Sequence, residues 1–402
     1  MRTLDWVVLF GWLLCIVGYG LWRGRGSTTV DKYLRAGKEM PWYAMGLSIM
    51  ATQASAITFI STTGQSYVDG MRFVQFYFGL PLAMVILSAT AVPIFHRANV
   101  YTAYEYLEQR FDAKTRALVS VVFLVQRGLA AGISLYAPAV VLSVILGWPD
   151  RVTTWVMGGL VILYTAIGGI KAVTWADVQQ MTVIFAALVL ALGMAVFLLP
   201  SNVSFSDALT IAGAAGRLNP VTVKFDWNDR YNVFSGLIGG MFLALAYFGT
   251  DQSQVQRYLT GKSIGQSRLS LIFNAMAKIP MQFFILFIGA MVFVFFTFEK
   301  APVLFQPVAM KRIESEPRFG GIQDRYSKAF DARRAAAADL LSAKRAHDDA
   351  SWKAGLERYR AAQTSLDAAR KEGAKLAEDK LGIPGFNDTN YIFLSFVTRY
   401  LP

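Results

Sequence analysis

Residues 181–200 read MTVIFAALVLALGMAVFLLP, a run in which no side chain is charged. A helix of this length crosses a bilayer, because a rise of about 1.5 Å per residue over about 20 residues matches roughly 30 Å of hydrocarbon. Similar runs recur along the chain, in which 54% of the 402 residues are hydrophobic and 16% are charged. The alternating pattern of a membrane β-barrel is absent from the sequence. The sequence therefore predicts an all-helical integral membrane protein, since helices satisfy their own backbone groups in lipid.

We expect eight membrane-spanning helices, because eight segments are long and apolar enough for one crossing each. Their predicted ranges are 4–22, 43–67, 72–95, 118–147, 152–170, 180–200, 231–250 and 270–298. The first run has no basic stretch before it and no small-residue cleavage site after it. It is therefore predicted to be an uncleaved span rather than a secretory signal.

Lys and Arg in the short loops predict the orientation. Thirteen of these residues fall in loops on one side of the membrane and six in loops on the other. By the positive-inside rule the richer side is cytoplasmic, which places the N-terminus and the long segment 299–390 outside. We therefore expect a multi-pass protein of the cell (inner) membrane, in contact with the lipid bilayer.

Three regions are predicted: a transmembrane core at 1–298, a polar segment at 299–390, and the start of a ninth span at 391–402. Within the polar segment, residues 323–380 are rich in Ala, Lys, Arg, Asp and Glu. This composition is typical of a solvated helical hairpin or a short coiled coil. A wet helix face explains the charges most simply, and a docking surface for a partner has no specific support.

Several functions are disfavoured by composition. The only cysteine, Cys15, lies within a predicted span, and His96 and His347 are too few and too far apart for a metal cluster. The net charge of +12 fits cytoplasmic loops better than a nucleic-acid surface. Gly168-Gly169 lacks the context of a dinucleotide fingerprint and is better explained by close helix packing or the end of a span. No catalytic triad or phosphate loop is found, so we expect no enzyme.

The second predicted span carries an unusual density of polar side chains. They are Ser48, Thr52, Gln53, Ser55, Thr58, Ser61, Thr62, Thr63 and Gln65. One explanation is structural, since Ser, Thr and Gln commonly hydrogen-bond between helices in a bilayer. The other is a broken helix whose unwound carbonyls hold a small cation and whose half-helix ends meet a solute. Composition alone does not choose between them.

Charged residues inside spans are candidate site residues, because a charge in hydrocarbon is costly unless it faces a cavity or a partner. Arg127 is one; its alternative is a side chain that snorkels to the inner surface. Lys278 is another; its alternative is a structural pair with a carboxylate on a neighbouring helix. Asp177, near the inner end of the sixth span, is a hard oxygen ligand suited to sodium, or it caps a helix.

Four stretches resemble the sodium:solute symporter family, whose members carry sugars, sialic acid, iodide, monocarboxylates and vitamins. They are 101–111 (YTAYEYLEQRF), 136–139 (YAPA), 168–177 (GGIKAVTWAD) and 247–259 (YFGTDQSQVQRYL). The chain looks closest to the iodide, monocarboxylate and multivitamin branch. The resemblance implies an inverted-repeat fold of the LeuT type, with five plus five core helices preceded by one extra helix. It also implies that this chain is truncated after about eight spans.

The resemblance also implies roles for individual residues. The backbone carbonyls of Ala51 and Ala54, together with Asp177, are expected to bind sodium. The residues expected to face the solute are Gln53, Ser55, Thr58, Tyr77, Arg127, Tyr247 and Lys278, of which Tyr247 closes the inner side. In the family, further oxygen ligands come from a helix that would follow Pro402, so we expect the sodium site of this chain to be incomplete and weak.

These observations lead to one main hypothesis, sodium-coupled symport of a small solute, with Na⁺ as the coupling ion and no other cofactor. Arg127 and Lys278 could hold a negative charge in a low-dielectric cavity, which favours an anionic or carboxylated organic solute. The alternatives are a transporter-like sensory or scaffold module of the membrane and an inactive fragment.

Overall fold

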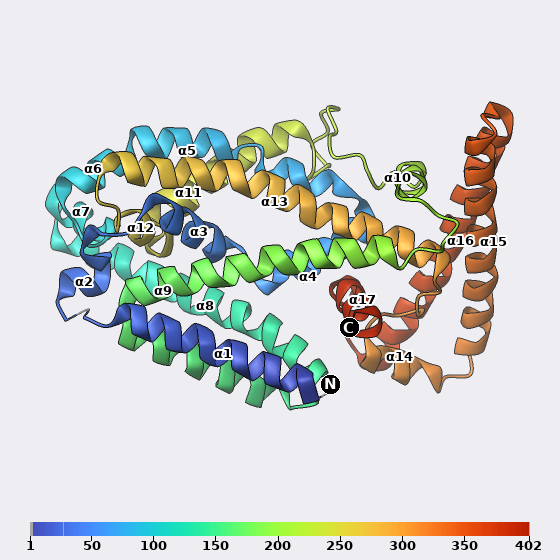
Figure 1. Ribbon diagram of the computed structural model, residues 1–402, viewed down its shortest axis with the longest axis horizontal. Helices are drawn as coiled ribbons and strands as arrows, with labels where there is room; N and C mark the ends of the chain where they lie inside the picture. Colours follow the sequence, from blue (N-terminus) through green and yellow to red (C-terminus); the bar gives the residue numbers. More distant parts are fainter. Residues whose placement is uncertain (1–2, 27, 402) are drawn as a thin grey trace. The chain divides into compact units, whose positions relative to one another are not determined.

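The computed structural model describes residues 3–26 and 28–401, and its regular elements over these residues are all helices (Figure 1). The chain divides into two compact units, which are described separately. The first unit contains Met1–Thr58, Gln75–Ala186 and Val223–Met281. The second unit contains Phe59–Val74, Ala187–Thr222 and Gln282–Pro402.

Fewer helices than predicted are long and apolar enough to span a membrane. Five pass this test over the described residues, and a sixth span results if one broken helix pair is counted as one. The five are Trp6–Gly24, Met71–Ala98, Ala113–Tyr136, Asp150–Phe197 and Ile264–Phe298. The seventh predicted span, 231–250, is represented by the shorter apolar helix Ser235–Thr250.

The predicted spans 152–170 and 180–200 form a single element, α9 (Asp150–Phe197). The polar residues 171–179 suggested a loop, but they continue the helix. Within α9 only Gly169 leaves helical geometry, with φ 60° and ψ −165°. A side chain there would be strained by the positive φ, and its Cβ would lie 2.8 Å from the carbonyl oxygen of Tyr33. Gly169 therefore marks the kink where two helices join.

The second predicted span is interrupted. Helix α3 (Trp42–Gln53) ends at Ala54, whose φ of −93° and ψ of 78° are not helical. Helix α4 (Ala56–Asp69) begins two residues later. The chain thus has a short non-helical segment in the middle of this predicted span.

The core of the first unit is formed by helices that are distant in sequence. They are α5 (Leu80–Ala89), α6 (Ala91–Ala98), α7 (Ala103–Arg110), α11 (Gly240–Thr250), α12 (Gln252–Tyr258) and α13 (Ile264–Phe298). Buried side chains from α3, α5, α7, α11, α12 and α13 form one cluster, which includes Ile49, Met84, Phe248 and Tyr258. Helix α11 runs alongside α5. Helices α1 (Thr3–Gly24), α2 (Val30–Arg35), α8 (Ala113–Leu146) and the first part of α9 complete the unit.

The second unit is dominated by a helical hairpin of α15 (Phe319–Arg345) and α16 (Asp349–Leu381), which pack along each other. The turn between them contains His347 at φ 54°, and the Asp348 side chain caps α16 by accepting from the amides of Ala350 and Ser351. Apolar residues such as Leu304, Phe330 and Leu366 form its core. The unit also contains α10 (Phe205–Ala214), α14 (Pro307–Glu314) and α17 (Ile392–Tyr400).

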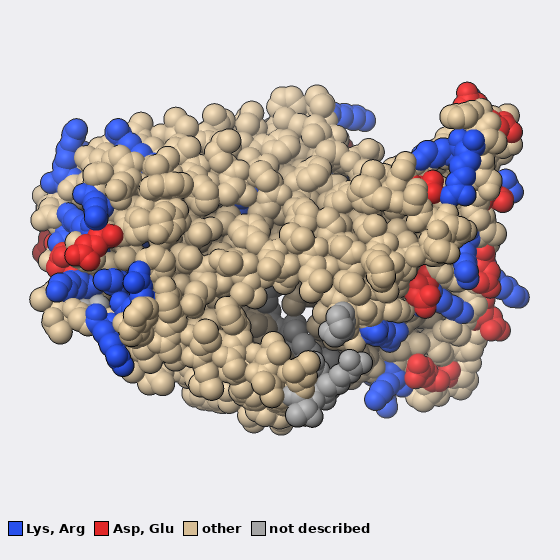
Figure 2. Space-filling view, in the orientation of Figure 1, with Lys and Arg blue, Asp and Glu red and all other residues tan. Residues whose placement is uncertain are grey.

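Charged side chains are unevenly distributed over the elements. Figure 2 shows them gathered over α2, α6 and α7 and over the α15–α16 hairpin, whereas the visible faces of α5 and α13 carry few. Many large apolar side chains are exposed on the long helices, among them Leu14, Leu124 and Ile162. Exposed apolar surface on helices of this length is expected where lipid, rather than water, surrounds them.

Candidate functional site

The interruption between α3 and α4 leaves polar groups in the middle of a span. The Thr58 hydroxyl donates to the carbonyl oxygen of Gln53 (3.1 Å), and the Thr58 amide donates to that of Ser55 (2.9 Å). The amide of Ala54 donates to the carbonyls of Ala51 (2.9 Å) and Met50 (3.1 Å). The side-chain oxygen of Gln53 is buried and has no hydrogen-bond partner among the described residues. Backbone carbonyl oxygens and the side-chain oxygen of Gln53, which accepts no hydrogen bond from the described residues, therefore lie around the break.

Asp177 lies inside α9, eight residues after the kink at Gly169, and not in a first turn where it would cap a helix. Ser48 Oγ on α3 donates to Asp177 Oδ2 at 2.6 Å. Arg257 on α12 donates from Nε to Ser48 Oγ (2.9 Å), and its Nη2 lies 3.4 Å from Asp177 Oδ2. These three side chains form one buried network that joins three helices.

Arg127 on α8 is held by a carboxylate. It forms a two-pronged ion pair with Asp251, in which Nε lies 3.1 Å from Oδ1 and Nη2 contacts Oδ2. Asp251 also caps α12 by accepting from the amide of Ser253 (2.9 Å). The Arg127 guanidinium lies 5.4 Å from the centre of the Tyr247 ring. The structure thus gives Arg127 a carboxylate partner.

A pocket of about 320 Å³ adjoins this ion pair. Residues of α7, α8 and α11 line it, together with Asp251; they include Tyr104, Phe123, Gln126, Tyr247 and Thr250. Its walls are mainly aromatic and aliphatic, with the amide of Gln126 and the Asp251 carboxylate as polar groups. Such a mixture is common in pockets for small molecules.

Lys278 on α13 is fully buried, and its ammonium nitrogen has no hydrogen-bond partner among the described residues. The nitrogen lies 5.7 Å from the centre of the Tyr77 ring. One turn earlier on the same helix, Asn274 is also fully buried, and within the described part of the chain neither its amide nitrogen nor its amide oxygen has a hydrogen-bond partner. A structural pair with a carboxylate on a neighbouring helix is therefore not found for Lys278. Unused buried donors of this kind are rare, and each requires an explanation.

All ten predicted site residues belong to the first unit. The structure brings together Tyr77 with Lys278, and Arg127 with Tyr247. It connects Asp177 to Ser48 and Arg257, two residues that we had not assigned to the site. Asp251 was also missed, although it lies within the stretch 247–259. The signal that could have revealed it is Asp-Gln-Ser at the start of a helix, a common N-cap pattern.

The protein is apolar and helical, one of its spans is broken at mid-length, and buried ionisable residues lie inside its helices. This is the architecture of a secondary transporter. The chain belongs to the sodium:solute symporter family, whose model matches residues 33–316. Members of this family are multi-pass membrane proteins, and the resemblance noted in the four sequence stretches is confirmed.

Individual relatives agree with this assignment. The human sodium/iodide cotransporter is 31% identical over 299 residues, which are 73% of this chain and 46% of the relative. Human sodium-coupled monocarboxylate transporter 1 is 34% identical over 276 residues, 67% of this chain and 44% of the relative. The sodium/sialic acid symporter SiaT of Proteus mirabilis is 32% identical over 299 residues, 73% of this chain and 59% of the relative. These relatives are transporters and not enzymes, and the chain spans about half of their length.

A solved structure supports the fold. It is the substrate-bound, outward-open state of a Na⁺-coupled sialic acid symporter, with a TM-score of 0.69 and 24% sequence identity. The match covers 99% of this chain and 78% of that chain. The predicted all-helical transporter fold of the LeuT type is thereby confirmed.

Proposed function

We propose that this chain carries out sodium-coupled symport of a small anionic or carboxylated organic solute across the cytoplasmic membrane. The observation that carries the proposal is the interruption at Ala54 and Ser55, because a broken span supplies unwound carbonyls for an ion and half-helix ends for a solute. Family membership and the sodium-coupled relatives support it. The transmembrane part is 1–298, with 299–390 as an insert and 391–402 as the start of another span.

The carbonyls of Ala51 and Ala54 and the carboxylate of Asp177 are the proposed sodium ligands. Oxygen donors suit a hard cation, and a buried acid offsets the charge of the ion. Arg257 already lies 3.4 Å from Asp177, so sodium and Arg257 would compete for one carboxylate. Movement of Arg257 is then part of sodium binding or release.

The remaining predicted residues, Gln53, Ser55, Thr58, Tyr77, Arg127, Tyr247 and Lys278, are the proposed solute contacts. Lys278 carries most of the preference for an anion, because its ammonium group has no partner among the residues that the structure describes, whereas Arg127 is already paired with Asp251. The unpartnered oxygen of Gln53 adds an acceptor for a hydroxyl or amide of the solute. Anions of this class include those named for the relatives: iodide, monocarboxylates and sialic acid.

The test is uptake by proteoliposomes that contain the complete product of the gene. Labelled iodide, lactate and sialic acid are offered with an inward sodium gradient and, in parallel, with choline in place of sodium. We expect at least one of these anions to accumulate only with sodium. Uptake that is equal in choline would exclude sodium coupling, and the absence of uptake for every anion tested would favour the sensory or scaffold alternative.

A further inference from the structure

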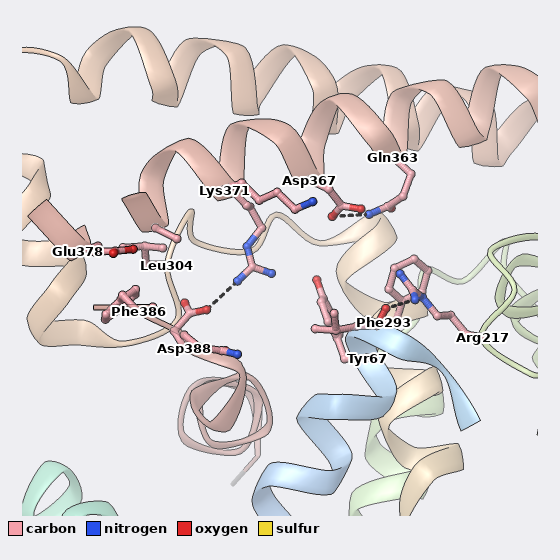
Figure 3. A pocket seen from close by; sticks show the side chains of 15 residues that line it. Tyr67, Arg217, Phe293, Leu304, Gln363, Asp367, Lys371, Glu378, Phe386 and Asp388 are labelled. Atoms are coloured by element: carbon pink, nitrogen blue, oxygen red, sulfur yellow. Dashed lines mark hydrogen bonds and ion pairs between the residues drawn. The ribbon is translucent and has the colours of Figure 1, made fainter. Parts of the chain in front are cut away.

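The second unit contains a pocket of about 440 Å³ that none of the proposed transport residues lines (Figure 3). Its walls come from the end of α4, from α13, from α16 and from the segment 385–388, with Arg217 on a further side. The family match ends at residue 316, so the α16 wall lies outside it. The volume is in the range of small-molecule sites.

Arg217 forms no ion pair with a carboxylate of the described residues. Its Nη1 donates to the carbonyl oxygen of Val68, and its guanidinium lies 4.8 Å from the centre of the Phe293 ring. Its Nε is buried without a hydrogen-bond partner, and among the described residues no carboxylate oxygen lies within 4.0 Å of it. Burial lowers the pKa of this guanidinium from its usual value, and the nearby negative charge of Asp367 opposes that shift only in part. A buried N–H donor of this kind favours an anionic acceptor.

Asp367 on α16 forms no ion pair with a Lys or Arg of the described residues. Its Oδ1 accepts from Gln363 Nε2 at 3.0 Å, and the oxygen of that amide accepts from Arg333 Nη1 at 2.9 Å. The amide therefore points its donor at Asp367 and is fixed by the buried Arg333. No Lys or Arg nitrogen of the described residues lies within 4.0 Å of the Asp367 carboxylate, and Lys371, one turn further along, is exposed to solvent.

Two further charged residues of the pocket wall, Arg370 and Asp388, form an ion pair with each other, and Lys371 and Glu378 also line the pocket. Arg370 Nη2 lies 3.1 Å from Asp388 Oδ1, and Asp388 Oδ2 accepts from the amide of Phe305. Arg370 Nε also donates to the carbonyl oxygen of Val303 at 3.1 Å. This pair ties the segment 385–388 to α16, and a dashed line at Asp388 marks it in Figure 3. It holds a wall of the pocket in place without leaving a charge for a ligand.

We propose that the pocket binds a small zwitterion with an apolar portion, such as an aromatic amino acid. The carboxylate of the ligand would pair with Arg217 and its ammonium group with Asp367, two oppositely charged residues that line the same pocket without forming an ion pair with each other. The apolar portion would lie against Tyr67, Phe293 and Phe386. A ligand with both charges satisfies both groups, whereas a simple anion or a simple cation leaves one of them uncompensated.

Isothermal titration calorimetry on the purified full chain in detergent tests the proposal. The three probes share a phenyl ring on a short chain and differ in their charges: L-phenylalanine, 3-phenylpropionate and 2-phenylethylamine. We expect L-phenylalanine to bind about tenfold or more tightly than either analogue, the ratio given by one charge-assisted hydrogen bond. Equal binding of L-phenylalanine and 3-phenylpropionate would show a plain anion site, and no binding of any probe would overturn the proposal.

Pocket variants separate this site from any other. Arg217→Gln should weaken binding of L-phenylalanine and 3-phenylpropionate, whereas Asp367→Asn should weaken only L-phenylalanine and 2-phenylethylamine. Ala374→Phe should exclude all three probes by filling the pocket, which gives an independent result if Arg217→Gln fails to fold. Lys353→Gln removes an exposed charge from the same hairpin outside the pocket and should change nothing. If binding survives in every pocket variant but is lost in Lys278→Met, the probes bind in the first unit. That result would refute the proposed site in the second unit.

Discussion

Ser48 and Asp177 lie 129 residues apart in sequence, yet Ser48 Oγ donates a 2.6 Å hydrogen bond to Asp177 Oδ2 inside the protein. The bond ties the first half of the interrupted span to the segment of α9 that follows the kink at Gly169. Arg257 donates to the same serine and lies beside the same carboxylate. A helix that ends in a break is thus fixed to an acid whose charge is only partly compensated.

Removing the Asp177 carboxylate should therefore change both the stability of the protein and the dependence of uptake on sodium concentration. In Asp177→Asn the buried Arg257 loses its anionic partner, and we expect unfolding in detergent to become easier by about 3–5 kcal/mol, the usual cost of breaking a buried pair. The sodium concentration for half-maximal uptake should rise about tenfold or more. The double variant Asp177→Asn, Arg257→Gln should be less destabilised than the sum of the single variants, and strict additivity would contradict direct coupling.

Lys278→Met should stabilise the protein and impair transport. The substitution removes a fully buried ammonium group, for which the described part of the chain offers no partner, and replaces it by an apolar side chain of similar length. We expect thermal unfolding to shift upward and uptake of the anionic solute to fall about tenfold or more. Lys262→Met, which alters an exposed lysine, serves as the control. A loss of stability together with unchanged uptake would show that Lys278 is a structural residue.

Arg127→Gln distinguishes a solute contact from a structural ion pair. If Arg127 contacts the anion, affinity for an anionic solute should fall about tenfold while a neutral analogue, such as the amide of the same acid, is spared. Because Asp251 would be left unpaired, the double variant Arg127→Gln, Asp251→Asn should recover stability but not anion affinity. Equal losses for the acid and its amide would assign Arg127 to structure alone.

The orientation can be checked with cysteine labelling in a Cys15→Ser background. Ser365 is exposed on α16, within the segment predicted to lie outside, and Lys262 is exposed in a loop predicted to lie inside. An impermeant maleimide added to intact cells should label Ser365→Cys but not Lys262→Cys. The reverse pattern would mean that the counts of basic residues in the loops gave the wrong orientation.

The sequence predicted those features that depend on local patterns. Apolar runs predicted membrane helices, and the density of Ser, Thr and Gln after Ser48 made an interrupted span one of two interpretations. The predicted gap at 171–179, which contains Thr174 and Asp177, continues the helix, and the kink lies earlier, at Gly169. In the structure these side chains are buried against other helices, so polarity there reflects tertiary partners and not exposure to water.

Long-range pairing is the part that a single sequence could not provide. Nothing local to Arg127 indicates that its partner is Asp251, and nothing local to Asp177 indicates Arg257, because these contacts depend on how α8, α9 and α12 pack. The same holds for the pocket beside α16, which Arg217 and Asp367 line from distant parts of the chain. The roles of the predicted sodium and solute residues stay predictions until transport is measured.

The α15–α16 hairpin is closed at its base, since α14 contacts both of its helices. Its far end is the short turn at His347, where Asp348 starts α16 with its own side chain. A chain segment anchored at its base can change length at its tip with only a small change in loop-closure entropy. The turn is therefore a natural insertion point, where a fluorescent reporter or an epitope can be carried without rebuilding the helices that support it.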